Sequence, residues 1–369
     1  MKKIIVTLLP LVVISGCFHK PGPVVPPYED GEAKTLKGAG TIFNEVLGYN
    51  TKDASIIQLG EERYVVYASN ETEQGAQVFA ARKGTLVEGK WVYGEKHIVL
   101  KGQEDTEKWD YNIYNPSVMK GTFSYQNTQY QYLIAYNGNN NNNGVNNHIG
   151  LAVTNDLLGQ YVRVGENPII ANPEIYEASY GYGCPSLVSY NQAGQGYLFF
   201  AVGDTDVSYT AVKTFDFTNL DQMVLESGYS ALPISGISDK VQGEAIITNA
   251  SFALSSDGNK IMMVRDRLPG SANRPGQTTE LEVSKANLAI LQDISESWEN
   301  VEFITGMKTI DMEDEESLGW DQIYSGDFVT DGYGKLLNAQ KAEVLYSTYD
   351  EDSNAALYSS TLAMYEVTL

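Results

Sequence analysis

Residues 115–119, Asn115-Pro-Ser-Val-Met, are followed by a polar turn and then by the apolar run Tyr132-Leu-Ile-Ala-Tyr136. Short apolar runs rich in β-branched and aromatic residues, joined by a tight turn, are typical of a β-hairpin. The same arrangement occurs five times in the chain. Its first residues are Asp53, Asn115, Cys184, Asn249 and Ser325.

The five copies share the pattern x-[Pro/Ala/Gly]-[Ser/Asp]-apolar, and their spacings are 62, 69, 65 and 76 residues. Each interval leaves room for two further strands, such as 150–153 and 161–164. Repeats of about this length, each with four strands, predict a five-bladed β-propeller built from four-stranded antiparallel blades. A long β-sandwich or two separate β domains are the alternatives that the strand pattern leaves open.

The N-terminal segment MKKIIVTLLPLVVISGC has two lysines, a short apolar stretch and small residues before Cys17. This pattern resembles a bacterial lipoprotein signal, in which Cys17 becomes the lipid-bearing N-terminus. The sequence therefore predicts a signal peptide over 1–16, a proline-rich tether over 17–40 and the propeller over 41–369. It also predicts export and attachment to a bacterial membrane, at the outer membrane or cell surface. An ordinary signal peptide that contains a cysteine is the alternative.

The charge balance restricts the partners of the chain. There are 25 Lys and Arg against 47 Asp and Glu, which gives a net charge of −22. Such acidity argues against nucleic acid and against an anionic membrane surface as partners. If Cys17 carries lipid, Cys184 is the one remaining cysteine, so no intrachain disulfide is expected.

Three stretches resemble the five-bladed enzymes of glycoside hydrolase family 43. Residues 53–57 are similar to the first-blade Asp-Pro-Ser motif, and 113–118 with 132–136 are similar to the second-blade strands. Residues 147–156 through 167–170 are similar to the third and fourth strands of that blade. The resemblance spans about residues 45–369 as a pattern, and it implies a carbohydrate substrate.

The resemblance also implies catalytic roles. Family members use a general base in blade one, a pKa-tuning Asp in blade three and a general acid near the start of blade four. An inverting mechanism places acid and base roughly 6.5–9.5 Å apart around a water molecule. Asp53 fills the base position, but Cys184 fills the blade-three position. Asn249 is in register in blade four, and Glu244 is the nearest acid to it.

Each of these residues also has a structural interpretation. Asp53 could cap a turn at the start of a strand, and Glu244 could be a solvated loop residue. Cys184 could be a small buried hydrophobic residue. The sequence thus predicts Asp53 and Glu244 as catalytic residues, with one family position clearly matched.

Residues at the channel mouth and its rim are the predicted saccharide contacts, because aromatic faces stack on sugar rings and polar side chains bind hydroxyls. They are Asn115, Cys184, Asn249, Trp109, Asp110, Tyr182 and Trp320. The alternative for the aromatic residues is structural packing. No cofactor and no metal site are predicted from residue spacing, and a channel calcium ion, as in some family members, is left open.

Three functions are consistent with these patterns. The first is a surface lipoprotein that acts on a poly- or oligosaccharide, by inverting hydrolysis if it is catalytic. The second is a glycan-binding lipoprotein that has lost the catalytic residues. The third is a scaffold or adhesin that holds a protein partner on the propeller rim.

Overall fold

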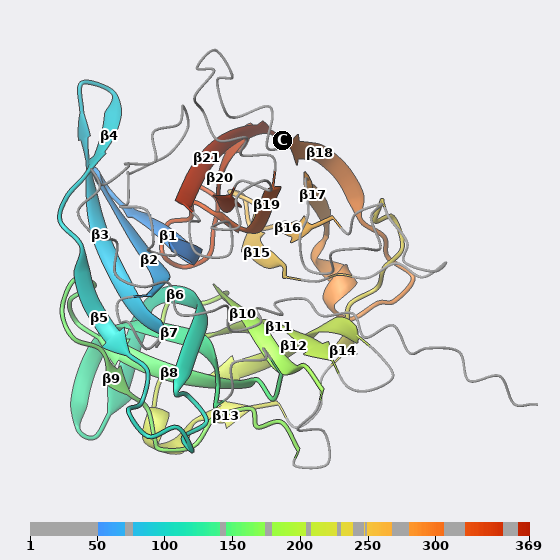
Figure 1. The fold of residues 1–369 in the computed structure, drawn as a ribbon. Helices are drawn as coiled ribbons and strands as arrows, with labels where there is room; N and C mark the ends of the chain where they lie inside the picture. Colours follow the sequence, from blue (N-terminus) through green and yellow to red (C-terminus); the bar gives the residue numbers. More distant parts are fainter. Residues whose placement is uncertain are drawn as a thin grey trace, which may run out of the picture.

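The computed structural model describes residues 51–70, 77–140, 145–173, 179–203, 208–226, 230–238, 247, 249–267, 280–305, 322–349 and 361–369. The predicted signal peptide, the tether and Cys17 lie outside these residues. The described strands form five antiparallel sheets that follow one another around a central axis (Figure 1). The prediction of an all-β, five-bladed propeller is therefore confirmed.

Blade one contains β1 (Thr51–Leu59), β2 (Glu62–Asn70), β3 (Gln77–Val87), β4 (Lys90–Tyr93) and β5 (His97–Lys101). Blade two contains β6 (Asn112–Tyr125), β7 (Thr128–Asn139), β8 (His148–Thr154) and β9 (Val162–Arg163). Blade three contains β10 (Gly181–Ser189), β11 (Gln195–Gly203), β12 (Ser208–Asp216), β13 (Val224–Leu225) and β14 (Ser230–Ala231). Blade four contains β15 (Ser251–Leu254), β16 (Lys260–Asp266), β17 (Glu280–Asn287) and β18 (Glu299–Thr305). Blade five contains β19 (Gln322–Phe328), β20 (Lys341–Tyr349) and β21 (Thr361–Thr368).

Strands pair in chain order within each blade, from the first strand outward. Blades one and three carry an additional short strand, because β5 pairs with β3 and β14 pairs with β12. Blade five has three strands among the described residues. Two short 3₁₀ helices, η2 (Leu220–Gln222) and η3 (Leu288–Leu291), follow the third strands of blades three and four. No helix in the described part of the chain is long and apolar enough to cross a membrane.

The hydrophobic core lies between neighbouring blades. Each blade has apolar side chains on both faces. One face packs on the preceding blade and the other on the following blade. At the interface of blades three and four, for example, the rings of Phe199 and Phe252 stack with centroids 4.1 Å apart. Burial of aromatic and aliphatic surface in this way is the dominant stabilising contribution of a fold without disulfides. Cys184 is a free, buried cysteine.

The first residue of each repeated motif has the same unusual backbone. These residues, which we call position one, have φ of 50°, 47°, 49°, 46° and 53° at Asp53, Asn115, Cys184, Asn249 and Ser325. The left-handed region is uncommon for residues other than glycine. In blades one, two, three and five it coincides with a register shift in the pairing of the first two strands, which is a β-bulge. The repeated motif thus encodes a left-handed residue in every blade and a β-bulge in four of the five first strands.

A ring of hydrogen bonds joins the blades two residues further on, at position three. Ser55 accepts from the Val118 amide at 3.1 Å. Ser117 accepts from the Leu187 amide at 2.9 Å, and Ser186 accepts from the Phe252 amide at 3.0 Å.

Asp327 closes the ring. One of its carboxylate oxygens accepts from the hydroxyl of Ser251 in blade four. The other accepts from the Ile56 amide of blade one at 3.0 Å. The hydroxyl or carboxylate at position three of every blade therefore bonds to a neighbouring blade, which explains why the sequence repeats Ser or Asp there.

The end of the channel beyond the ring is closed by residues 330–334, which follow β19. Carbonyl oxygens of this segment accept hydrogen bonds from the residue five places after position one in each of the other four blades. The donors are Gln58 (2.7 Å), Lys120 (2.6 Å), Ser189 (2.9 Å) and Leu254 (2.8 Å). The insertion between β19 and β20 is therefore a structural part of the channel, and the position-one residues lie on the other side of the ring.

The ring makes a testable contribution to stability. Ser186→Ala should lower the free energy of unfolding by about 1–3 kcal/mol, because the buried Phe252 amide loses its acceptor. Ser230→Ala, at an exposed position of β14, is the matched control and should change it by less than about 0.5 kcal/mol. Urea denaturation measures both. Equal effects of the two substitutions would contradict the proposed role of the ring.

Candidate functional site

The five position-one residues line a single hollow at one end of the channel, together with the residues that follow them in each first strand. Its volume is about 30 Å³, which is room for one or two water molecules. A sugar ring cannot enter such a space. A saccharide would therefore lie across the mouth and contact only the side chains that reach it.

Asp53 is the position-one residue of blade one and is only 5% exposed. Its amide donates to the hydroxyl of Ser347 at 3.0 Å, and the Lys52 ammonium lies 3.9 Å from one carboxylate oxygen. Burial raises the pKa of Asp53, although the Lys52 charge and a hydrogen bond from Ser325 oppose that rise. Asp53 is thus a buried carboxylate with a cation beside it.

Cys184 and Asn249 contact each other directly. The thiol donates to the Asn249 amide oxygen at 3.1 Å and also contacts the Tyr180 hydroxyl at 3.3 Å. The left-handed backbone of Asn249 fixes it as the position-one residue of blade four. The blade-three position that carries an acid in the resembled family is therefore a thiol here, hydrogen-bonded to the position-one amide of blade four. Glu244, the acid nearest to that blade-four residue in the sequence, lies outside the described residues.

Asp266, at the end of β16, lies directly behind two residues that line the mouth, Asn249 and Ser325, and the sequence did not reveal it. One of its oxygens accepts from the Asn249 side-chain amide at 2.8 Å, and the other accepts from the Ser325 backbone amide at 2.8 Å. Burial raises the pKa of Asp266 to about 7. It belongs to a second strand and falls outside the repeated motif, so the comparison of first strands could not find it.

Trp109 and Asp110, which were predicted as saccharide contacts on the rim, use their side chains in contacts within the protein. Asp110 is fully buried, and its carboxylate bonds to Arg163 at 2.6 Å and to the Tyr136 hydroxyl at 3.1 Å. Trp109 stacks on the Tyr136 ring at 5.7 Å and donates to the Glu166 carbonyl at 2.9 Å. The carboxylate of Asp110 is therefore not available for the predicted saccharide contact, because Arg163 holds it inside blade two.

Tyr182 is half-buried and packs edge-to-face on Phe200, with ring centroids 6.0 Å apart. Its ring is therefore partly used in the core between blades two and three. Asn115 is buried at the mouth, as its motif position predicts. Glu244, Trp320 and Cys17 lie outside the described residues.

The donors at the mouth do not fit a bound calcium ion. Both oxygens of Asp266 accept hydrogen bonds, as do both oxygens of Asp327, and the Asp53 carboxylate lies beside an ammonium group. Among the described ranges, no three His, Cys, Asp or Glu side chains group as metal ligands. Calcium prefers six to eight oxygen ligands without competing cations.

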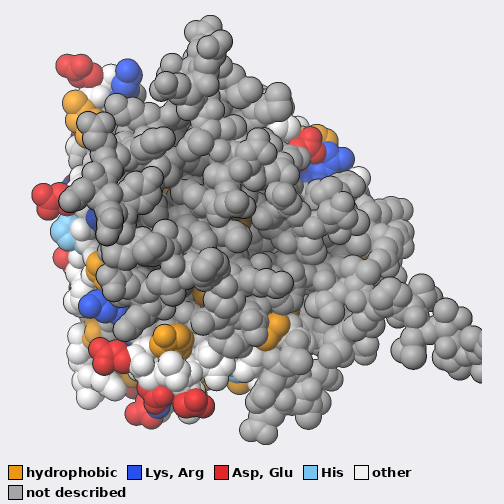
Figure 2. Space-filling view, viewed as in Figure 1, with side chains coloured by type: hydrophobic (Ala, Val, Ile, Leu, Met, Phe, Trp, Pro, Cys, Tyr) orange, Lys and Arg blue, Asp and Glu red, His pale blue; other side chains and the backbone are white. Residues whose placement is uncertain are grey.

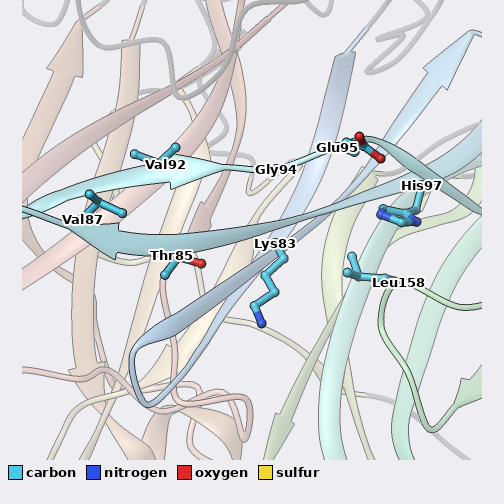
Figure 3. Close-up of a pocket in the computed structure, with 8 residues that line it drawn as sticks. All are labelled: Lys83, Thr85, Val87, Val92, Gly94, Glu95, His97 and Leu158. Carbon is cyan, nitrogen blue, oxygen red and sulfur yellow. The ribbon is translucent and has the colours of Figure 1, made fainter.

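A second hollow, of about 440 Å³, lies away from the channel on the outer strands of blade one (Figure 3). Val87, Val92 and Leu158 form its apolar part, and Lys83, Glu95 and His97 add charged or polar groups. It is an open surface depression without the convergent buried groups of the mouth. Acidic and basic side chains of described residues are interspersed along the edge of the molecule seen in Figure 2.

Comparison with solved structures identifies the class of protein that has this fold. An α-L-arabinofuranosidase from Podospora anserina in complex with cellotriose matches with a TM-score of 0.53 and 12% identity, over 94% of this chain and 95% of that one. A family 117 glycoside hydrolase from Zobellia galactanivorans matches with a TM-score of 0.56 and 10% identity, over 92% of each chain. A GH43_1 enzyme from Xanthomonas citri matches with a TM-score of 0.52 and 9% identity, over 90% of this chain and 91% of that one.

These similarities show the fold, which is that of the five-bladed glycoside hydrolase propellers. The chain matches no protein-family model. It also matches no curated protein. The resemblance seen in the sequence is thus confirmed at the level of the fold, and the residues at the mouth must carry any inference about activity.

The pair Lys52–Asp53 should stabilise the mouth. Lys52→Met should lower the free energy of unfolding by about 3 kcal/mol at pH 7.5, because a buried carboxylate loses its cation. The loss should shrink at lower pH, where Asp53 becomes protonated. Lys341→Met, which removes the exposed pair with Glu366, is the control and should cost less than about 1 kcal/mol. Equal losses in urea denaturation would show that Lys52 does not stabilise Asp53.

Proposed function

We propose that this protein binds a poly- or oligosaccharide at the mouth of its propeller channel without the three-carboxylate hydrolysis of the resembled family. The hydrogen bond of 3.1 Å between the Cys184 thiol and the Asn249 amide carries the proposal. It joins the blade-three position at which that family has an acid to Asn249, the blade-four residue that is in register with the family's general acid. A thiol and an amide cannot replace a general acid and the carboxylate that tunes it.

The chemistry of the mouth supports a carbohydrate ligand. Carboxylates and amides at the bottom of a shallow hollow can bind the hydroxyl groups of a sugar that rests across it. The fold adds support by analogy, since the similar enzyme from Podospora anserina was solved in complex with cellotriose.

Hydrolysis is the second candidate, and the position of Asp53 favours it. Asp53 occupies the first-blade position at which the resembled family has its general base, and it lines the mouth. In that reading Asp53 would activate water and Glu244 would protonate the leaving group. The two carboxyl groups would then lie less than about 10 Å apart across the mouth.

The proposal includes attachment of the protein to a membrane through lipid on Cys17. The sequence pattern before Cys17 and the proline-rich segment after it support this location. An anchored propeller would present its mouth to glycans outside the cell.

The Asp53→Asn substitution tests the proposal. The purified protein is screened against polysaccharides by affinity electrophoresis, and the affinity of any ligand is then measured by calorimetry. Asp53→Asn should weaken binding by about 10- to 100-fold, because a charge-assisted hydrogen bond is lost. Asp257→Asn, in an exposed turn, should leave the affinity unchanged.

Turnover distinguishes the two candidates. Neither the wild type nor Asp53→Asn should cleave aryl glycosides or the bound polysaccharide. Cleavage by the wild type that disappears in Asp53→Asn would replace the binding proposal with hydrolysis. Binding that is equally tight in both proteins would show that the mouth is not the site.

A further inference from the structure

Asp266 and Asp53 are connected through one residue. The backbone amide of Ser325 donates to Asp266 at 2.8 Å, and the side chain of Ser325 hydrogen-bonds to the Asp53 carboxylate. Both carboxyl groups are buried, with 7% of Asp266 and 5% of Asp53 exposed. Two carboxylates this close and this dry repel each other, so one of them tends to keep a proton.

The described charged groups around the pair determine which carboxyl keeps it. Lys52 lies beside Asp53. Arg265 is adjacent to Asp266 in β16, but its guanidinium pairs with Glu282 of β17 and donates to the backbone oxygen of Asp266 at 3.1 Å. Among the described charged groups, Asp53 and Arg265 act directly on Asp266. Lys52 lies beside Asp53, Glu282 pairs with Arg265, and Cys184 bonds to Asn249, which itself bonds to Asp266. Asp327 bonds to Ser251 and to the Ile56 amide.

Because Lys52 lies beside Asp53 and the Arg265 guanidinium pairs with Glu282, the proton belongs on Asp266. The cation favours the ionised form of Asp53, whereas the negative charge of Asp53 and burial both favour the neutral form of Asp266. The direction agrees with the pKa of about 7 for Asp266. Pairs whose surroundings separate their pKa values in this way are typical of functional sites.

We propose that Asp53 and Asp266 form a coupled carboxyl pair, bridged by Ser325, that is the saccharide-contacting centre of the mouth. Asp266 keeps the proton and donates a hydrogen bond to a saccharide oxygen, while ionised Asp53 accepts one from a saccharide hydroxyl. This inference rests on the proposed glycan-binding function and assigns it a residue from the second strand of blade four.

The pair also specifies the class of ligand. A neutral sugar offers both hydroxyl donors and oxygen acceptors, which match the two roles. A uronic acid would bring a carboxylate against ionised Asp53, which is repulsive in a buried setting. The mouth is therefore suited to neutral saccharides.

The pH dependence of binding tests the pair. With the neutral saccharide found in the screen, the affinity of the full-length wild type should be constant from pH 5.5 to about 6.5. It should then fall by up to about tenfold per pH unit above pH 7, as Asp266 loses its proton. Asp266→Asn does not titrate, so its affinity should be flat above pH 7. At pH 6 it should be weaker than that of the wild type, because the amide nitrogen replaces one of two oxygens that accept hydrogen bonds from Asn249 and Ser325. Asp257→Asn should keep the wild-type profile.

Unfolding without any saccharide provides an independent measurement. A carboxyl whose folded-state pKa is raised contributes stability that is present below its unfolded pKa of about 4 and is lost as the pH rises toward about 7. Between pH 4 and 7 the wild-type unfolding midpoint should therefore fall relative to that of Asp266→Asn. Burial also raises the pKa of Asp327, to about 6. Its contribution to the pH dependence of unfolding is the same in both proteins, so it cancels in the difference between their midpoints.

The outcomes separate the two proposals. If the unfolding difference is present but no saccharide binds, the pair stands and the glycan-binding function fails. If the wild type and Asp266→Asn have the same pH dependence in both binding and unfolding, the pair is overturned. If Asp266→Asn does not fold, a ¹³C titration of aspartate carboxyls in the wild type should show one group near pH 7 besides one near pH 6. Its absence would overturn the pair.

Discussion

The ring of hydrogen bonds at position three is the constraint on which the rest of the structure depends. Each blade is a sheet with two apolar faces and cannot be stable alone, so the blades must be fixed relative to one another at the axis. Ser55, Ser117 and Ser186 each accept an amide of the next blade, and Asp327 joins blade four to blade one. These bonds are buried or partly buried. An unmade buried hydrogen bond costs more than a formed one contributes. The ring therefore favours one arrangement of five blades.

The same constraint builds the site. A side chain at position three can reach the next blade only if the strand bends two residues earlier, and the left-handed residue at position one makes that bend. The bend also directs the position-one side chains into the mouth. Because the fold fixes the backbone at position one, the residue type there can vary: Asp, Asn, Cys and Ser all occur. A propeller of this kind can lose catalytic acids without losing its structure.

The sequence predicted the features that repeat. Five copies of one motif were sufficient to identify the blades, the first strands and the convergence of Asp53, Asn115, Cys184 and Asn249. Asp266 and Lys52 were not predicted, because each occurs once and outside the motif register. The buried position of Asp110 depends on Arg163, which is 53 residues away in the chain, and no local pattern reveals such a pair. The closing segment 330–334 looked only like an insertion, since its bonds run to four other blades.

The claim that the mouth is the saccharide site can be tested most directly at Cys184. With Cys17 replaced by serine, Cys184 is the one thiol of the chain, and it lies at the mouth. The measurement is the ¹³C chemical shift of the Cys184 β-carbon, in protein labelled at cysteine, as the saccharide is titrated. The account predicts that this shift moves in proportion to saccharide occupancy. A shift that is unchanged at saturating saccharide would show that the saccharide binds elsewhere and would contradict the account.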